Sequence, residues 1–307
     1  MPLASTAPQD LAPSSPTFTT DGYTHSRDGT RLHYYTLGEG APALVCCDGL
    51  GCDGYVWKYI AEEFSPAHQV VRFHYRGHGK SDPPADRSHL HIADLVDDVA
   101  CVMDQNGVEK GVLLGHSLGV QVILEFHRRY PERVQGLVPT CGTYGRVVDT
   151  FRDNPMSRHA FGLLNHLVHR FPGAAQRVWS IFGTDLAYTV ATHTEVNGDL
   201  LKREDFQPYL KHMSKMDVKL FFDLASDAAE NDNLAHLSEI DVPTLIIAGE
   251  RDGFTPEWLS HVMHARIPGS ELLMVPGGTH TAPIEVPDLV DLRLKRWLDE
   301  RVRPTLA

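Results

Sequence analysis

Short apolar runs that alternate with amphipathic stretches constrain this chain more than any other feature. Residues 31–37, 43–47, 69–75, 111–115 and 134–139 have the length and composition of β-strands. Helical stretches separate several of them, and the apolar residues of one such stretch, from Ile92 to Met103, follow i, i+3, i+4 and i+7 spacing. Strand–helix alternation of this kind predicts an α/β fold with a mostly parallel central sheet and helices on both faces.

The alternation stops near residue 145 and resumes at Pro243. Between these points the chain shows helical stretches with no apolar strand run between them. A strand at 243–248, a helix near 259–267, a strand at 271–275 and a last helix then follow. We therefore expect a core formed by residues 21–144 and 238–307, with residues 145–237 inserted as a helical cap. Residues 1–20 are rich in Pro, Ser, Thr and Ala and are expected to form a flexible N-terminal tail.

The strongest chemical signal is the pentapeptide Gly115-His116-Ser117-Leu118-Gly119. It has the form G-x-S-x-G, with a predicted strand directly before it and a predicted helix directly after it. The serine must sit on a sharp turn, so the positions two before and two after it must be small enough for strand and helix to approach. The helix N-terminus then directs its dipole and free N–H groups at the nucleophile. We interpret Ser117 as a catalytic serine rather than a buried turn residue.

A serine hydroxyl needs a base, and the base needs a carboxylate to orient it. In this kind of fold the chain order is Ser, acid, His. His280 follows the last predicted strand in P-G-G-T-H, where the glycines let the loop turn back over the sheet edge. Asp252 follows the preceding strand, and Glu250 is its competitor two residues earlier. We favour Asp252 as the acid and His280 as the base.

An oxyanion hole should supply two backbone N–H groups. One belongs to Leu118, the residue after the nucleophile, and the other to Leu50 in the loop Asp48-Gly49-Leu50-Gly51. The same loop starts a G-x-G-x-x-G match at 49–54, which would suit a dinucleotide. A dinucleotide site also needs an acidic residue at the end of the next strand, and that strand ends at Tyr75-Arg76. We therefore favour the oxyanion loop.

Taken together, these motifs resemble the α/β-hydrolase superfamily, and the resemblance covers nearly all of the chain from about Gly22. Residues 75–82 (Y-R-G-H-G-K-S-D) match the family's R-G-x-G-x-S turn, 249–252 (G-E-R-D) match its acid loop, and 278–280 (G-T-H) match its histidine loop. The resemblance implies a serine hydrolase of the esterase-like kind with a helical cap. The motifs are specific for the fold and poorly specific for the substrate.

One position departs from the family pattern. The family usually has His-Gly before the oxyanion residue, and this chain has Asp48-Gly49. An unpaired carboxylate beside a developing negative charge would raise the reaction barrier. We therefore expect Asp48 to be ion-paired, with Arg76 on the neighbouring loop as its partner.

Charge and cysteine content exclude several function classes. The chain of 307 residues carries 28 Lys and Arg against 40 Asp and Glu, a net charge of −12. That charge opposes binding to nucleic acid and to anionic membranes, so we expect neither as a partner. No basic segment followed by an apolar stretch marks a secretory signal. Five cysteines without framework spacing favour reduced thiols, and hence a cytoplasmic protein.

Two histidine pairs and several aromatic residues carry weaker signals. His166 with His169, and His261 with His264, have i, i+3 spacing that could bind a metal, but no carboxylate or cysteine completes either set. We expect polar helix faces there, and neither a metal nor an organic cofactor. Large aromatics gather in the cap, where most should form its core and some should bind substrate; the candidates are Phe151, Phe161, Phe182 and Phe221.

The sequence thus predicts a serine hydrolase that cleaves small to medium apolar carboxylic esters through an acyl-enzyme. The same residues could serve a lactonase, a thioesterase, a carbon–carbon bond hydrolase or an acyltransferase. Epoxide and haloalkane hydrolases use an Asp nucleophile, which position 117 excludes. A non-catalytic ligand-binding protein on the same fold is the alternative of another class. The oligomeric state and the substrate's identity do not follow from the sequence.

Overall fold

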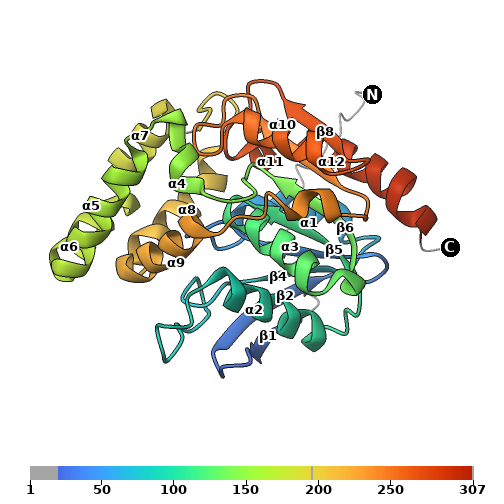
Figure 1. Cartoon of the computed structure of the whole chain (residues 1–307), viewed down its shortest axis with the longest axis horizontal. Coiled ribbons are helices and arrows are strands. Elements are labelled where there is room, and N and C mark those ends of the chain that lie inside the picture. Colours follow the sequence, from blue (N-terminus) through green and yellow to red (C-terminus); the bar gives the residue numbers. More distant parts are fainter. Residues whose placement is uncertain (1–19, 195, 306–307) are drawn as a thin grey trace, which may run out of the picture.

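The computed structural model describes residues 20–194 and 196–305, and its centre is an eight-stranded sheet (Figure 1). The order across the sheet is β1-β2-β4-β3-β5-β6-β7-β8. The strands are β1 Thr20–His25, β2 Arg31–Leu37, β3 Ala43–Cys47, β4 Val70–Phe73, β5 Gly111–His116, β6 Val134–Thr140, β7 Leu245–Gly249 and β8 Glu271–Val275. β2 runs antiparallel to both of its neighbours, β1 and β4, and all other pairs are parallel. This is the predicted α/β-hydrolase fold.

Helices cover both faces of the sheet, as the alternation predicts. They are α1 Lys58–Phe64, α2 Ile92–Gln105, α3 Leu118–Arg129, α4 Val147–Thr150, α5 Ser157–Arg170, α6 Pro172–Trp179, α7 Asp185–Thr194, α8 Arg203–Lys215, α9 Val218–Glu230, α10 Glu257–Arg266, α11 Ala282–Glu285 and α12 Pro287–Trp297. Helices α1 and α12 pack on one face, whereas α2, α3 and α10 pack on the other.

The central strands are buried on both faces, which explains their almost wholly apolar sequences. In β3, Val45 and Cys47 face the α2–α3 side, whereas Leu44 and Cys46 face the α1–α12 side. Val45 lies between Val71 of β4 and Leu113 of β5 in the parallel register. Parallel strands end at the same sheet edge, so the loops after β3, β5, β7 and β8 meet there. All the predicted catalytic residues lie on or just after these loops.

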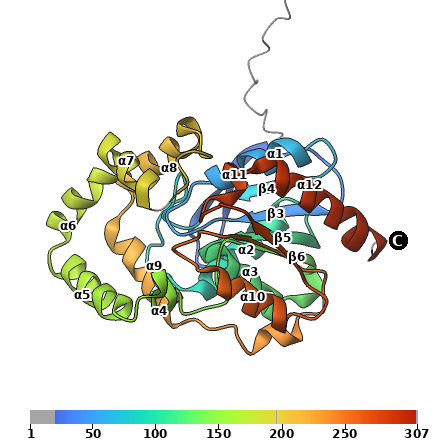
Figure 2. The same cartoon turned by 90° about the horizontal axis from the view of Figure 1, so that it is seen from above.

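The helices α4 to α9 lie between β6 and β7 in the chain and beyond the carboxyl ends of the strands (Figures 1 and 2). Seen from above, α5, α6 and α7 form an outer arc, and α8 and α9 lie between this arc and the sheet (Figure 2). Trp179 shows how the layers join, because its indole N–H donates to the Met213 carbonyl of α8 and its ring packs on Phe221 of α9.

The N-terminal part differs from the prediction in two ways. Residues 1–19 of the expected tail lie outside the described residues, but Thr20 already belongs to β1. The strand β1 was not predicted, because its sequence T-D-G-Y-T-H is polar and mostly exposed at the edge of the sheet. Backbone pairing with β2 holds this segment, and no hydrophobic pattern marks such pairing in the sequence.

Candidate active site

The loop from β5 into α3 holds Ser117 in a strained backbone conformation, with φ 53° and ψ −114°. Non-glycine residues rarely adopt positive φ, and such strain concentrates at functional sites. The flanking glycines are required for steric reasons. A side chain at Gly119 would collide with the Cys47 carbonyl oxygen, and one at Gly115 would collide with the Gly119 backbone. The turn thus presents the Ser117 side chain at the sheet edge, where it remains partly accessible.

Asp252 and His280 meet at this edge from the loops after β7 and β8. The His280 Nδ1 lies 2.9 Å from the Asp252 carboxylate. Asp252 is almost fully buried and also accepts the backbone N–H groups of Phe254 and Thr255 and the Thr255 hydroxyl. Burial alone would raise the pKa of Asp252, but His280 and the Thr255 donors together bring it below its usual value. The carboxylate therefore stays ionised and orients the imidazole.

His116 connects the serine turn with the histidine loop, and this link was not predicted. Its Nε2 lies 2.8 Å from the backbone carbonyl oxygen of His280, so that nitrogen carries the proton and donates. Burial lowers the pKa of His116 to about 3, which keeps the ring neutral. The two imidazole rings lie 4.9 Å apart. Among the described residues, no hydrogen bond joins the Ser117 hydroxyl to His280, and catalytic bonds of this kind often tighten only with substrate bound.

The loop at residues 48–51, which we expect to form the oxyanion hole and call the oxyanion loop, lies directly against Ser117. A Cβ atom built on Gly49 would lie 3.0 Å from the Ser117 Cβ. In the same loop, the Gly51 N–H donates to His78 Nε2 at 3.0 Å. The His78 Nδ1–H in turn donates to the Arg76 carbonyl oxygen. The Leu118 N–H has no acceptor in its own helix because Leu118 begins α3. In the described part of the chain, the Leu50 N–H has no backbone acceptor.

The expected ion pair between Asp48 and Arg76 is wrong. Arg76 is buried, and its guanidinium pairs with Asp98 at 2.6 Å and with Asp28 at 2.9 Å. It also donates to the His89 carbonyl and the Ser26 hydroxyl. These bonds use all three nitrogens of the guanidinium, and they join the turn after β1 and the loop after β4 to α2. Arg76 therefore has a structural role in the core.

Asp48 is buried under the loop that carries Gly54 and Trp57, and neither of its carboxylate oxygens has a hydrogen-bond partner among the described residues. Burial raises the pKa of Asp48 to about 7, although Arg72 and the nearby N–H groups of Trp57 and Gly54 limit the rise. Partial protonation, rather than an ion pair, thus reduces the negative charge beside the oxyanion loop.

Two glutamates accept hydrogen bonds from the backbone of the histidine loop. Glu250, the rejected acid candidate, is exposed and accepts the Gly277 N–H at 2.7 Å. Glu285, which sequence reasoning missed, is buried and accepts the N–H and hydroxyl of Thr279 and the hydroxyl of Thr281. It also accepts the Asn197 N–H from the segment after α7. A buried acid in a short helix such as α11 has no sequence signature that would distinguish it from a surface one.

The aromatic candidates divide into two groups. Phe151 packs on Phe254, and Phe254 stacks on the His280 ring at 4.9 Å between centroids. Phe221 lies beside the oxyanion loop, 3.4 Å from where a Cβ of Gly51 would stand. Phe161 instead stacks on Phe222 inside the helical segment, and Phe182 packs on Trp179 and is 39% exposed. Phe151 and Phe221 therefore border the site, and the contacts of the other two lie elsewhere.

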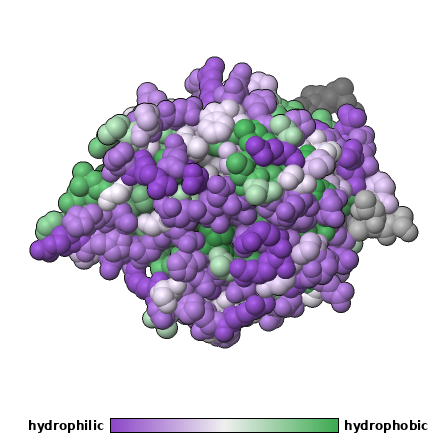
Figure 3. Space-filling model, in the orientation of Figure 1, coloured by the Kyte–Doolittle hydropathy of each residue, from purple (hydrophilic) through white to green (hydrophobic). Residues whose placement is uncertain are grey.

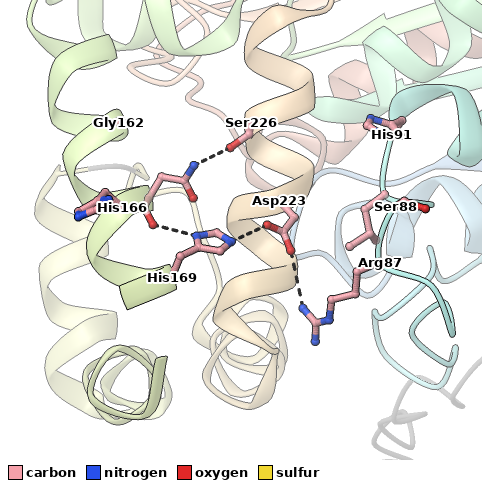
Figure 4. Close-up of a pocket in the computed structure, with 10 residues that line it drawn as sticks. Arg87, Ser88, His91, Gly162, His166, His169, Asp223 and Ser226 are labelled. Atoms are coloured by element: carbon pink, nitrogen blue, oxygen red, sulfur yellow. Dashed lines mark hydrogen bonds and ion pairs between the residues drawn. The ribbon is translucent and has the colours of Figure 1, made fainter. Parts of the chain in front are cut away.

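A separate pocket of about 580 Å³ lies between α5, α9 and the loop at 87–91 (Figure 4). Asp223 bridges its two walls, because it accepts from His169 at 2.8 Å and lies 3.7 Å from Arg87. His169 also bonds the Asn165 carbonyl. Neither Ser117 nor His280 lines this pocket. Within the described residues no group of three His, Cys, Asp or Glu side chains is arranged to hold a metal ion.

Comparison with known proteins agrees with this architecture. The family model for the alpha/beta hydrolase fold matches residues 42–287. Human "Epoxide hydrolase 4" is 25% identical, over 94% of this chain and 82% of its own length. An esterase (EaEST) from Exiguobacterium antarcticum has a TM-score of 0.73 at 20% identity, covering 92% of this chain and 100% of its own. The enol-lactonase from Burkholderia xenovorans LB400 has a TM-score of 0.71 at 22% identity, covering 91% and 100%.

Proposed function

We propose that this chain, which belongs to the alpha/beta hydrolase fold family, is a serine hydrolase that cleaves carboxylic esters through an acyl-enzyme. The observation that carries the proposal is the strained turn at Ser117. It lies at the sheet edge where Asp252 and His280 meet, and His116, the residue before it, bonds the His280 carbonyl oxygen. Positive φ at a non-glycine residue costs free energy, and such strain concentrates at functional sites. Hydrolase names among the relatives and structural neighbours support the same class.

The proposed reaction proceeds in two halves. Ser117 Oγ attacks the ester carbonyl carbon while His280 Nε2 takes the hydroxyl proton, and Asp252 stabilises the resulting imidazolium. The N–H groups of Leu50 and Leu118 stabilise the oxyanion. His280 then gives the proton to the leaving alcohol, and the acyl group remains on Ser117. Water, deprotonated by His280, attacks the acyl-enzyme and releases the carboxylic acid with Ser117 restored.

The side chains around the site favour a neutral, apolar acyl group. Phe254, backed by Phe151, forms one wall against His280. Met213 and Phe221 come from α8 and α9 and lie against Gly51 of the oxyanion loop. These helices belong to the inserted segment, which we propose acts as a cap with residues 145–237 as its bounds. Such walls bind substrate mainly by burying its apolar area.

The five cysteines are all free, and four of them are buried. No described helix is long and apolar enough to cross a membrane. Free thiols persist in a reducing compartment, so we propose a cytoplasmic location. The mechanism above uses no metal or organic cofactor, and its partner is a small-molecule ester.

Substitution of the three residues tests the proposal through p-nitrophenyl ester turnover. Ser117→Ala should lower kcat/KM by several orders of magnitude with the fold intact, because only the nucleophile is removed. His280→Ala should cost nearly as much, and Asp252→Asn should cost less because the carboxylate does not react. The control is Ser238→Ala at an exposed serine, which should match the wild type. If Ser117→Ala keeps more than about a tenth of the turnover, another residue is the nucleophile.

A further inference from the structure

Helix α5 carries a second apolar face that nothing in the described chain covers. One side of the helix packs on α9, where Phe161 stacks on Phe222 and Asn165 bonds Ser226 at 3.1 Å. A surface helix usually has only one such side. On α5 a different stripe projects outward, and its members are Leu163, Leu164, Leu167 and Phe171 at the C-cap, which are 61%, 52%, 42% and 53% exposed.

Further exposed apolar residues lie along the rest of the outer arc. We call this arc the arm and define it as residues 157–193. Val178 of α6, Ile181 of the following turn and Leu186 of α7 are 67%, 50% and 65% exposed. Of the fourteen large hydrophobic residues exposed in the described chain, nine lie in the arm. Figure 3 shows hydrophobic residues among hydrophilic ones at the left end of the molecule, where Figure 1 places α5 to α7. Exposed apolar surface concentrated in this way marks an interaction site.

The charge of the arm is opposite to that of the whole molecule. The arm contains three arginines and one aspartate, whereas the chain as a whole carries a net charge of −12. Arg158 pairs with Asp149 and Glu230, but Arg170 and Arg177 make no ion pair within the described residues. Arg170 lies 5.0 Å above the ring of Phe171, so free positive charge adjoins the apolar stripe.

The exposed apolar surface and the unpaired positive charge of the arm together indicate what binds to it. Arm-to-arm contact between two copies would place like charges opposite one another, which disfavours a second copy on this surface. A helix surface with Leu and Phe beside Arg is instead the pattern of a segment that lies in a lipid interface. The net charge of −12 does not oppose this over the arm, because salt screens charges beyond about 8 Å.

We propose that the arm docks on the surface of an anionic lipid bilayer. The stripe on α5 enters the boundary between headgroups and acyl chains, and Arg170 and Arg177 lie at the level of the lipid phosphates. The expectation that the chain avoids anionic membranes rested on total charge alone, and the folded chain separates a basic apolar arm from an acidic body. Docking is independent of the proposed catalysis, so either can fail without the other.

Flotation of the whole protein with lipid vesicles tests the docking. The wild type should float with phosphatidylcholine vesicles that contain phosphatidylglycerol, float less with phosphatidylcholine alone, and be released by added salt. The double variants Leu163→Asp/Leu167→Asp and Arg170→Glu/Arg177→Glu should each lower the partition by about tenfold or more. The matched control is Leu292→Asp, because Leu292 is 68% exposed on α12 outside the arm. It should float like the wild type.

Two further measurements distinguish membrane docking from misfolding of the variants and from self-association. Thermal unfolding and turnover of a short soluble ester should stay unchanged in all of these variants, which shows that they fold. Light scattering with size-exclusion chromatography reports self-association. The proposal is overturned if the wild type does not float with phosphatidylglycerol vesicles at low salt, or if Leu292→Asp loses as much binding as the arm variants. It is also overturned if Leu163→Asp/Leu167→Asp abolishes a dimer while vesicle binding is absent.

Discussion

Asp48 places a buried carboxyl group beside the oxyanion loop, with a pKa that burial raises to about 7. The folded chain therefore holds a proton that the unfolded chain releases near pH 4. Stability from this group is fully present below about pH 4 and is lost as the pH rises towards 7. At 1.36 kcal/mol per pKa unit, the loss is roughly 4 kcal/mol at most.

Asp48→Asn removes this titration and gives the first prediction. The free energy of unfolding should fall less steeply from pH 4 to pH 7 in the variant than in the wild type, so that the variant gains relative stability as the pH rises. Urea unfolding at several pH values measures the difference. Any constant cost of the new amide shifts the whole curve and leaves the slope readable. Parallel curves for the two proteins would show that Asp48 is ionised throughout this range.

His116 positions the histidine loop, because its Nε2–H donates to the His280 carbonyl oxygen. His116→Phe removes this bond and should lower kcat by about tenfold with little change in KM, since a hydrogen bond contributes about 1 kcal/mol and small displacements of a base are costly. His116→Gln offers an N–H donor again and should recover part of kcat. A purely structural role would instead lower the melting temperature of both variants and leave kcat of the folded fraction unchanged.

At the scale of elements, the helices α8 and α9 bring Met213 and Phe221 against the oxyanion loop. Each buried methylene contributes about 0.8 kcal/mol, or roughly fourfold, until the wall is filled. For p-nitrophenyl esters from acetate upward, kcat/KM should therefore rise to a maximum at intermediate length and then fall. Phe221→Ala should weaken the rise, whereas Phe171→Ala, at an exposed aromatic, should keep it. A flat profile, or a preference for acetate, would mean that these aromatics only form the core of the cap.

The elements also show where sequence reasoning succeeds and where it stops. Strands β3 and β5 were placed correctly because burial on both faces leaves a continuous apolar run. The turn at Ser117 was placed because steric limits require glycine on both sides. The partner of Arg76 could not be found in this way, because it depends on packing between distant segments. The two apolar faces of α5 likewise required the folded helix, since the sequence does not show which face packs on α9.

At the scale of the whole molecule, net charge is an average over the chain, and the fold determines which charges lie on which surface. The net charge of −12 opposes binding to nucleic acid, but it does not describe the surface of the arm. The fold places this arm at one end of the molecule, beyond the site that we propose is catalytic (Figures 1 and 2). The alternative hypothesis, a non-catalytic ligand-binding protein, predicts the same overall architecture, so the fold alone does not distinguish it from an enzyme.

Labelling with a fluorophosphonate probe, detected by mass spectrometry, distinguishes a serine hydrolase from a ligand-binding protein most directly. The account predicts that folded wild-type protein gains one phosphonyl group and that the modified peptide contains Ser117. Labelling should be lost in Ser117→Ala and strongly slowed in His280→Ala, because the probe reacts only with a serine that a base activates. Folded wild-type protein that remains unlabelled, or that is labelled equally well in Ser117→Ala, would contradict the assignment and favour the ligand-binding protein.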